Sequence, residues 1–281
     1  MVMSSSRKLT YKKDSGTQEL EPLRHVDSDW TDYVLGEEVM TSGVPSMYSK
    51  SDGTLPYELV FVISGGTNRE RDFLKVLIKG TGPSSLRVIF LSKEGQGLHP
   101  NQMQERWKDI RTSGIVETDI QKFQLDVMDK IFLLTDVDEC YDQLVDILRE
   151  KAEGDNGEWV ISNPCFEIWL YYCYLNNPEE DLAVLKELPR AKRGQTMKSL
   201  GDTLISGGLN SIRAFEQMHD GIKNSASHYA LDENGIPVLF ATQMHLMARY
   251  LVDTLNSNAS EYDDYIRNKR EFREHMKRSE K

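Results

Sequence analysis

Asp136 and Asp138 carry the clearest chemical signal in this sequence, because they follow a buried apolar run. The run Ile131–Leu134 is short and begins with a β-branched residue, which is typical of a buried strand in a parallel sheet. Side chains two residues apart on an extended chain point the same way and lie ~7 Å apart. Two like charges at that spacing repel each other unless a cation lies between them. Hard carboxylate oxygens favour Mg²⁺ or Mn²⁺ over zinc.

The same residues also have a purely structural interpretation. Asp138 is suited to cap the helix that follows, and Asp136 is suited to a local hydrogen bond in the turn. Glu139 is either a first-turn residue that the helix dipole favours or a further ligand or base. We predict Asp136 and Asp138 as metal ligands and catalytic residues, with Glu139 as another catalytic candidate, because other segments bring polar groups to the same place.

A second group of candidate residues follows the apolar strand Leu59–Ile63. Gly65 and Gly66 allow a tight turn in which backbone N–H groups face an anion at the start of a helix. Thr67 and Glu70 match a capping box, in which each side chain bonds the other's backbone N–H. The same geometry directs Glu70 toward the strand end. We therefore predict Glu70 as a catalytic residue and Gly65 and Gly66 as phosphate contacts.

Strands and helices alternate in the middle of the chain. Strands are expected over 59–63, 86–91, 130–135 and 158–161, and helices over 68–79, 100–126, 139–152 and 165–172. Repeated strand–helix units with right-handed crossovers predict an α/β fold, with a parallel sheet covered by helices on both faces. Every strand then ends at one edge of the sheet.

This common edge adds residues from two further loops to the predicted site. Lys93 follows the second strand and Asn163 follows the fourth, and both are predicted phosphate contacts. Asn163 is also expected to cap the next helix, with Pro164 in its first turn. Glu167 lies on that apolar helix, so its carboxylate is expected to bond the 162–164 turn or to belong to the site.

The flanking regions carry weaker signals. Residues 1–56 show no sustained hydrophobic period and are predicted to be a flexible or partner-binding extension before an α/β domain over 57–178. A helical region is expected over 179–281, with helices over 179–188, 195–206, 209–223, 238–256 and 260–278. It contains a basic cluster, which either grips a phosphate backbone or forms a solvated helix end: Lys186, Arg190, Lys192, Arg193 and Lys198.

Composition narrows the class of protein. The 281 residues are 28% charged and 39% hydrophobic, as in ordinary globular proteins, and the net charge of -11 argues against a broad basic face for nucleic acid. No stretch approaches the ~18 apolar residues of a membrane span. The polar start, Met1–Ser6, does not resemble a signal peptide. Three cysteines without metal-type spacing predict a reduced, cytoplasmic protein.

Three motifs resemble those of a known family. The string Val160–Leu170 closely resembles the signature of RloB-like proteins, which are related to AbiL-type abortive-infection factors. Leu133–Glu139 is similar to that family's acidic strand end, and Ser92–Gly97 resembles its second-strand loop. The resemblance covers about 58–178, with a weaker helical match onward. It implies a Toprim-like domain, in which a Glu after the first strand and a later Asp-x-Asp hold magnesium for phosphodiester chemistry.

The resemblance implies a Mg²⁺- or Mn²⁺-dependent nuclease-type effector of antiphage defence that cleaves DNA or RNA, often with an ABC-type ATPase partner. The family's first-strand Glu-Gly is here Gly65-Gly66, and its second Glu falls on Glu70. Either Glu70 or Glu139 replaces the lost carboxylate, or the glycines bind phosphate through N–H groups alone, or the site binds without cutting. The alternative function is therefore a degenerate Toprim module that binds nucleotide, nucleic acid or a partner ATPase. A third possible function is that of a nucleotide-binding α/β protein of another kind, which would bind nucleotide independently of Asp136 and Asp138.

Overall fold

The computed structural model describes most of the chain from residue 58 onward and the backbone of four short strands before it. The described ranges are 10–13, 16–19, 31–33, 46–48, 58–93, 97–118, 121–137, 140–150, 155, 157–257 and 260–279. The short strands are β1 (Thr10–Lys13), β2 (Gly16–Glu19), β3 (Thr31–Tyr33) and β4 (Ser46–Tyr48). The prediction of an N-terminal extension over 1–56 falls mostly outside these residues and stays a prediction.

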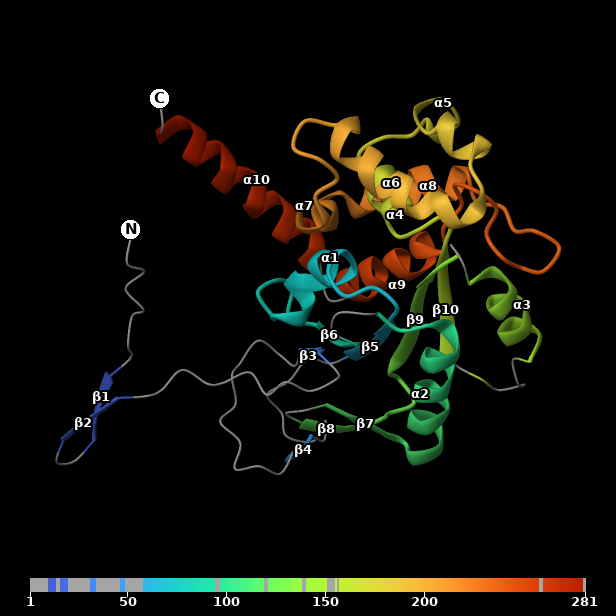
Figure 1. The fold of residues 1–281 in the computed structure, drawn as a ribbon. Helices are drawn as coiled ribbons and strands as arrows, with labels where there is room; N and C mark the ends of the chain where they lie inside the picture. Colours follow the sequence, from blue (N-terminus) through green and yellow to red (C-terminus); the bar gives the residue numbers. More distant parts are fainter. Residues whose placement is uncertain are drawn as a thin grey trace.

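Four parallel strands form the centre of the fold, as the alternation of strands and helices predicts (Figure 1). Across the sheet they are β10 (Gly157–Ser162), β9 (Lys130–Asp136), β5 (Glu58–Ser64) and β6 (Leu86–Ser92). β3 pairs antiparallel with β6 at the outer edge. The parallel strands are almost wholly buried because their sequences are near-continuous apolar runs. The predicted α/β architecture is confirmed, and these four strands end at one edge.

Helices cover both faces of the sheet. The helices α1 (Arg69–Ile78), α4 (Glu167–Tyr172) and α9 (Met244–Asn256) pack against one face, and α2 (Pro100–Ser113) packs against the other. Alternate side chains of β5 enter the two cores: Val60 and Val62 pack with the first set, and Phe61 packs with α2. The helix α3 (Tyr141–Arg149) packs in a smaller third cluster with Val137 and Ile161.

The segment after α2 differs from the expected helix over 100–126. The helix ends at Ser113, and a hairpin of β7 (Ile115–Glu117) and β8 (Gln121–Gln124) follows. Gly114 ends the helix in the left-handed conformation, with a φ of 68°, which glycine adopts without a steric penalty. Val116 and Phe123 are fully buried against the α2 side of the sheet, so tertiary packing stabilises the hairpin.

The predicted helical region is confirmed in kind, with different boundaries. It contains α5 (Pro178–Asp181), the 3₁₀ helices η2 (Ala183–Glu187) and η3 (Phe215–Gln217), α6 (Arg190–Leu204), α7 (Ser211–Ala214), α8 (Met218–Ser227), α9 and α10 (Glu261–Ser279). These helices share the sheet's core, since Phe73 of α1 contacts Trp169 of α4 and Phe215 of η3 edge to face. α10 projects from the body in Figure 1. No helix among the described residues combines the length and the apolar character that a membrane crossing requires.

Candidate functional site at the strand ends

Each of the four parallel strands ends in a polar residue: Ser64, Ser92, Asp136 and Ser162. Ser64 and Ser92 are completely buried, and their hydroxyls have no hydrogen-bond partner in the described part of the chain. Ser162 bonds the Thr242 hydroxyl at 2.8 Å. Buried hydroxyls without partners are costly and are concentrated at functional sites. The carboxyl edge of the sheet therefore holds polar groups that packing alone does not explain.

Glu70 reaches this edge from the start of α1. Its carboxylate folds back over the glycine turn, so that a Cβ on Gly66 would lie 2.0 Å from Glu70 Oε1. Only glycine at position 66 leaves room for this conformation. Glu70 is 9% exposed, and with Asp136, Thr135 and Ser162 it lines a small, closed pocket that has no room for a water molecule in this structure. The structure thus brings together Glu70 and Asp136, which the sequence predicted as site residues on separate elements.

Burial and a neighbouring carboxylate change the acidity of Glu70. Desolvation, followed by the negative charge of Glu167, raises the pKa of Glu70 to about 7, against an ordinary value of 4.5. Lys198 and Arg69 act in the opposite direction. A carboxyl group with this pKa exchanges its proton near neutral pH, which suits general acid–base chemistry.

Glu167 belongs to the same cluster. Its Oε1 lies 3.3 Å from Arg69 Nε, so the partner is a side chain of α1 and not the predicted 162–164 turn. Glu167 is 3% exposed, and its Oε2 has no hydrogen-bond partner in the part of the chain described. Burial, followed by the charges of Glu167 and Asp136, raises the pKa of the Cys165 thiol. The cluster therefore joins three carboxylates with two cations, Arg69 and Lys198.

Two predicted caps are wrong. Asn68, and not Thr67, is the N-cap of α1 and makes no side-chain cap bond, and Glu70 turns into the pocket at the strand ends. α4 begins at Glu167, with Phe166 before it as the N-cap. Asn163 instead donates one Nδ2 hydrogen to the Pro237 carbonyl at 2.7 Å, and its predicted phosphate contact stays a prediction.

The remaining predicted site residues fall into three groups. The Gly65 N–H donates to the Leu134 carbonyl at 2.9 Å and extends the sheet, so it does not face an anion as predicted. Gly66 and Lys93 lie at the predicted edge, and their phosphate roles stay predictions. Asp138 and Glu139 lie outside the described residues.

The position of the missing carboxylate has little free space. A Cβ on Gly65 would lie 3.0 Å from the Leu98 carbonyl oxygen, which is closer than ordinary contact. The Leu98 N–H donates to the Gly65 carbonyl at 3.1 Å. Gly97 has a φ of 68°, and a Cβ there would lie 2.1 Å from the Gly65 oxygen. The 97–98 segment therefore closes over Gly65, and Glu70 supplies a carboxylate on the neighbouring side.

The donor atoms suit a hard divalent cation. Glu70 and Asp136 offer carboxylate oxygens in one pocket, and the unpartnered Oε2 of Glu167 lies in the same cluster. Among the described residues, however, no three His, Cys, Asp or Glu side chains are arranged to hold a metal ion. A Mg²⁺ or Mn²⁺ site at this edge therefore stays a prediction, in which Asp136 and Glu70 would need further ligands, and the predicted candidates Asp138 and Glu139 lie outside the described residues.

Two cations of the cluster were not predicted as site residues. Arg69 directly precedes Glu70 in the segment that follows a predicted strand, so the sequence alone could have identified it as a candidate site residue. Lys198 was recognised only as a member of a basic cluster, because no local pattern connects α6 with β9. Its place beside Asp136 and Glu167 follows from the packing of α4 against α6.

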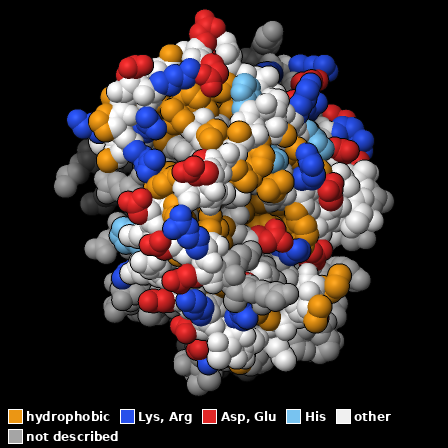
Figure 2. Space-filling view, turned by 90° about the vertical axis from the view of Figure 1, so that its right-hand side faces the viewer, with side chains coloured by type: hydrophobic (Ala, Val, Ile, Leu, Met, Phe, Trp, Pro, Cys, Tyr) orange, Lys and Arg blue, Asp and Glu red, His pale blue; other side chains and the backbone are white. Residues whose placement is uncertain are grey.

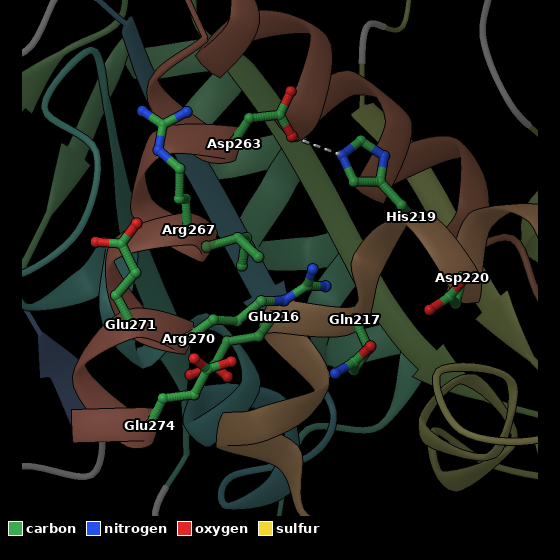
Figure 3. Close-up of a pocket in the computed structure, with 10 residues that line it drawn as sticks. Glu216, Gln217, His219, Asp220, Asp263, Arg267, Arg270, Glu271 and Glu274 are labelled. Carbon is green, nitrogen blue, oxygen red and sulfur yellow. Dashed lines mark hydrogen bonds and ion pairs between the residues drawn. The ribbon is translucent and has the colours of Figure 1, made fainter. Parts of the chain in front are cut away.

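A separate hollow of about 530 Å³ lies between α10 and the segment from η3 to α8 (Figure 3). Side chains of both signs line it, and His219 Nε2 lies 3.3 Å from Asp263 Oδ1 across it. At its rim Glu216 accepts from Arg273 Nη2 at 2.9 Å. Because this hollow contains none of the predicted site residues, we place the candidate site at the strand ends.

The surface agrees with the acidic composition. On the face in Figure 2, the described Lys, Arg, Asp and Glu side chains are interspersed, and no broad basic area forms there. This face therefore offers no extended basic surface to a nucleic-acid strand.

The fold and the pocket define an α/β protein with a carboxylate site at the carboxyl edge of a parallel sheet, an arrangement consistent with a Toprim-like fold. A family model described as RloB-like protein matches residues 60–251. The chain therefore belongs to the RloB-like family. The match extends from β5 into α9, so it includes the helices that surround α4 as well as the sheet. No curated protein and no solved structure matches the chain.

Proposed function

We propose that this protein is a divalent-metal-dependent nuclease-type effector of antiphage defence that cleaves phosphodiester bonds in DNA or RNA. The observation that carries the proposal is the convergence of Glu70 and Asp136, from α1 and β9, in one pocket at the carboxyl edge of the sheet. Ligands of α/β proteins bind at this edge. Membership of the RloB-like family supports a role in defence, and an ABC-type ATPase is the proposed partner.

Each residue has a defined task in this proposal. Asp136 and Asp138 hold Mg²⁺ or Mn²⁺, with Glu70 or Glu139 as a further ligand or base. The ion would polarise the scissile phosphate and lower the pKa of a bound water. Glu70, whose pKa lies near neutrality, accepts the proton of the attacking water. Arg69 holds Glu167 in place through their ion pair. All three cysteines are free thiols, which supports the proposed cytoplasmic location.

A second candidate function is the degenerate Toprim module, which binds nucleotide, nucleic acid or a partner ATPase without cleavage. One observation favours it: position 65 lacks the carboxylate of the resembled motif, and the Leu98 carbonyl limits the space for a side chain there. Two-metal catalysis needs ligands for both ions, so the loss of one carboxylate weakens at least one metal site.

Three proteins test the proposal: the wild type, the double variant Asp136→Asn/Asp138→Asn, and Asp142→Asn as a control. Asp142 is exposed on α3, so its substitution changes charge outside the pocket. Mn²⁺ binding is measured by calorimetry, and cleavage is measured with supercoiled plasmid and with single-stranded RNA. We expect the double variant to lose Mn²⁺ binding and at least about a hundredfold in cleavage rate, because the ion contributes several kcal/mol to the transition state. The control should resemble the wild type.

The outcomes separate the two functions. Cleavage that the double variant retains in full would overturn the nuclease proposal. Mn²⁺ and oligonucleotide binding by the wild type without turnover of either substrate would establish the binding module instead.

A further inference from the structure

The basic cluster of the helical region is divided by the fold. Three of its members have structural partners: Lys186 pairs with Glu179, Arg190 lies 3.9 Å from the Tyr141 ring centroid, and Arg193 Nε donates to the Leu188 carbonyl at 2.9 Å. Lys192 is exposed on α6. Lys198 differs from the others, because the carboxylates at the strand ends lie close enough to raise its pKa.

The packing of α6 determines this orientation. The buried Cys165 thiol donates to the Gly194 carbonyl at 3.7 Å, which joins the start of α4 to α6. Residues four apart lie on the same face of a helix, so Lys198 lies on the same face of α6 as Gly194, which contacts the start of α4. Met197, between them, is completely buried in the core and holds this face of α6 against the sheet domain.

Lys198 lies in the electrostatic field of the site. The residue is exposed, yet partial burial of its ammonium group lowers its pKa, while Glu167, Asp136 and Glu70 raise it and prevail. Within the described residues, Lys198 forms no ion pair within 4 Å of any of these carboxylates, whereas Arg69 pairs with Glu167 at 3.3 Å. Lys198 therefore carries a full charge and keeps its N–H donors available to a ligand.

A second observation points to a ligand at this place. Glu167 is 3% exposed. Its Oε1 pairs with Arg69, and its Oε2 has no hydrogen-bond partner in the described residues. A buried carboxylate oxygen left in this state is costly unless something binds nearby. When Glu70 is ionised, as a bound cation favours, the carboxylates of Glu70, Asp136 and Glu167 outnumber the cations Arg69 and Lys198 among the described residues of the cluster, which suits a divalent cation and a phosphate.

We propose that Lys198 of α6 is a substrate contact of this site, which donates to a non-bridging oxygen of the phosphodiester held at the carboxylate pocket. The inference rests on the proposed function and extends it, because it makes the C-terminal helical region part of the substrate site. The bound group is the phosphodiester of a single nucleic-acid strand. The competing explanation is that Lys198 only neutralises the carboxylates.

The test measures binding and not turnover. A fluorescein-labelled 12-nucleotide single-stranded DNA and the RNA of the same sequence are titrated with full-length protein in Ca²⁺, and anisotropy is followed at several KCl concentrations. The variants are Lys198→Met, Lys198→Arg and the control Lys192→Met. Mn²⁺ affinity and thermal unfolding are measured for each, so that loss of fold or of the metal site is recognised separately.

Lys198→Met is expected to weaken binding of the preferred oligonucleotide about tenfold, because it removes one charge-assisted hydrogen bond. The slope of log K against log salt should fall by ~0.7, the contribution of one phosphate contact in a single strand. Lys198→Arg should retain most of the affinity, and Lys192→Met should bind like the wild type. Mn²⁺ affinity of Lys198→Met should be equal or higher, since a neighbouring positive charge is removed.

The failures are distinguishable. Wild-type protein that binds Mn²⁺ but neither oligonucleotide, or a folded Lys198→Met with wild-type affinity and salt slope, overturns the role of Lys198 and leaves the metal site standing. Wild-type protein that does not bind Mn²⁺ overturns the proposed function and this inference together. The substitution Lys198→Met should lower the affinity of the protein more for one of the two oligonucleotides, DNA or RNA, and that oligonucleotide identifies the type of strand that the site binds.

Discussion

The protonation of Glu70 makes the stability of this protein depend on pH in a defined direction. Burial and the charge of Glu167 raise the pKa of Glu70 from 4.5 to about 7 in the folded chain. Between these values the folded protein holds a proton that the unfolded chain has lost. The stabilisation of the folded protein by protonation of Glu70 is therefore fully present below pH 4.5 and is lost as the pH rises through 7. The difference corresponds to about 3 kcal/mol of unfolding free energy.

Glu70→Gln isolates this effect. The amide is nearly isosteric with the protonated carboxyl group and does not titrate, so the variant avoids the cost of a buried charge. The unfolding free energy of Glu70→Gln minus that of the wild type should increase by about 3 kcal/mol from pH 4.5 to pH 8. Urea unfolding followed by circular dichroism in EDTA measures it at each pH. Glu105→Gln, an exposed carboxylate on α2, is the control and should show a flat difference.

A flat difference for Glu70→Gln would refute the assignment of a buried, protonated Glu70. A difference of the opposite sign would mean that cations, and not burial, dominate the environment of this carboxylate. Repeating the titration with Mn²⁺ adds a second check, because a bound cation favours the ionised form and should remove the pH dependence of the wild type.

Two glycine substitutions test the turn that forms the pocket. In Gly66→Ala the new methyl group would lie 2.0 Å from Glu70 Oε1, which is the end of a flexible side chain, so the Glu70 carboxylate has to move. We therefore expect the Mn²⁺ affinity to fall at least about tenfold while the melting temperature changes little. An unchanged Mn²⁺ affinity would place Glu70 outside the metal site. Gly97→Ala combines a positive φ with an approach of 2.1 Å to the Gly65 backbone oxygen, so it should destabilise by about 1–3 kcal/mol in urea unfolding. Gly114→Ala has the same φ of 68° and nothing within 4 Å, so it should cost less, and equal costs would contradict the close approach.

Much of the fold could be predicted from short-range patterns. The runs around Phe61, Ile89, Leu133 and Val160 are long enough to identify the strands, and the helices between them imply parallel order. The hairpin of β7 and β8 was missed, because its stability comes from Val116 and Phe123 packing on a sheet formed by distant residues. The two predicted caps failed because both side chains turn toward distant elements: Asn163 donates to the Pro237 carbonyl, and Glu70 turns into the pocket lined by the ends of β9 and β10.

The sequence by itself determined that polar groups collect where four parallel strands end, since alternating strands and helices leave only one edge for them. It also indicated Asp136 and Glu70 as candidates and a departure from the family at Gly65. Tertiary structure alone decided how these groups meet. The pairing of Arg69 with Glu167 and the approach of Lys198 join elements far apart in the chain, and such contacts depend on helix packing that no local pattern encodes.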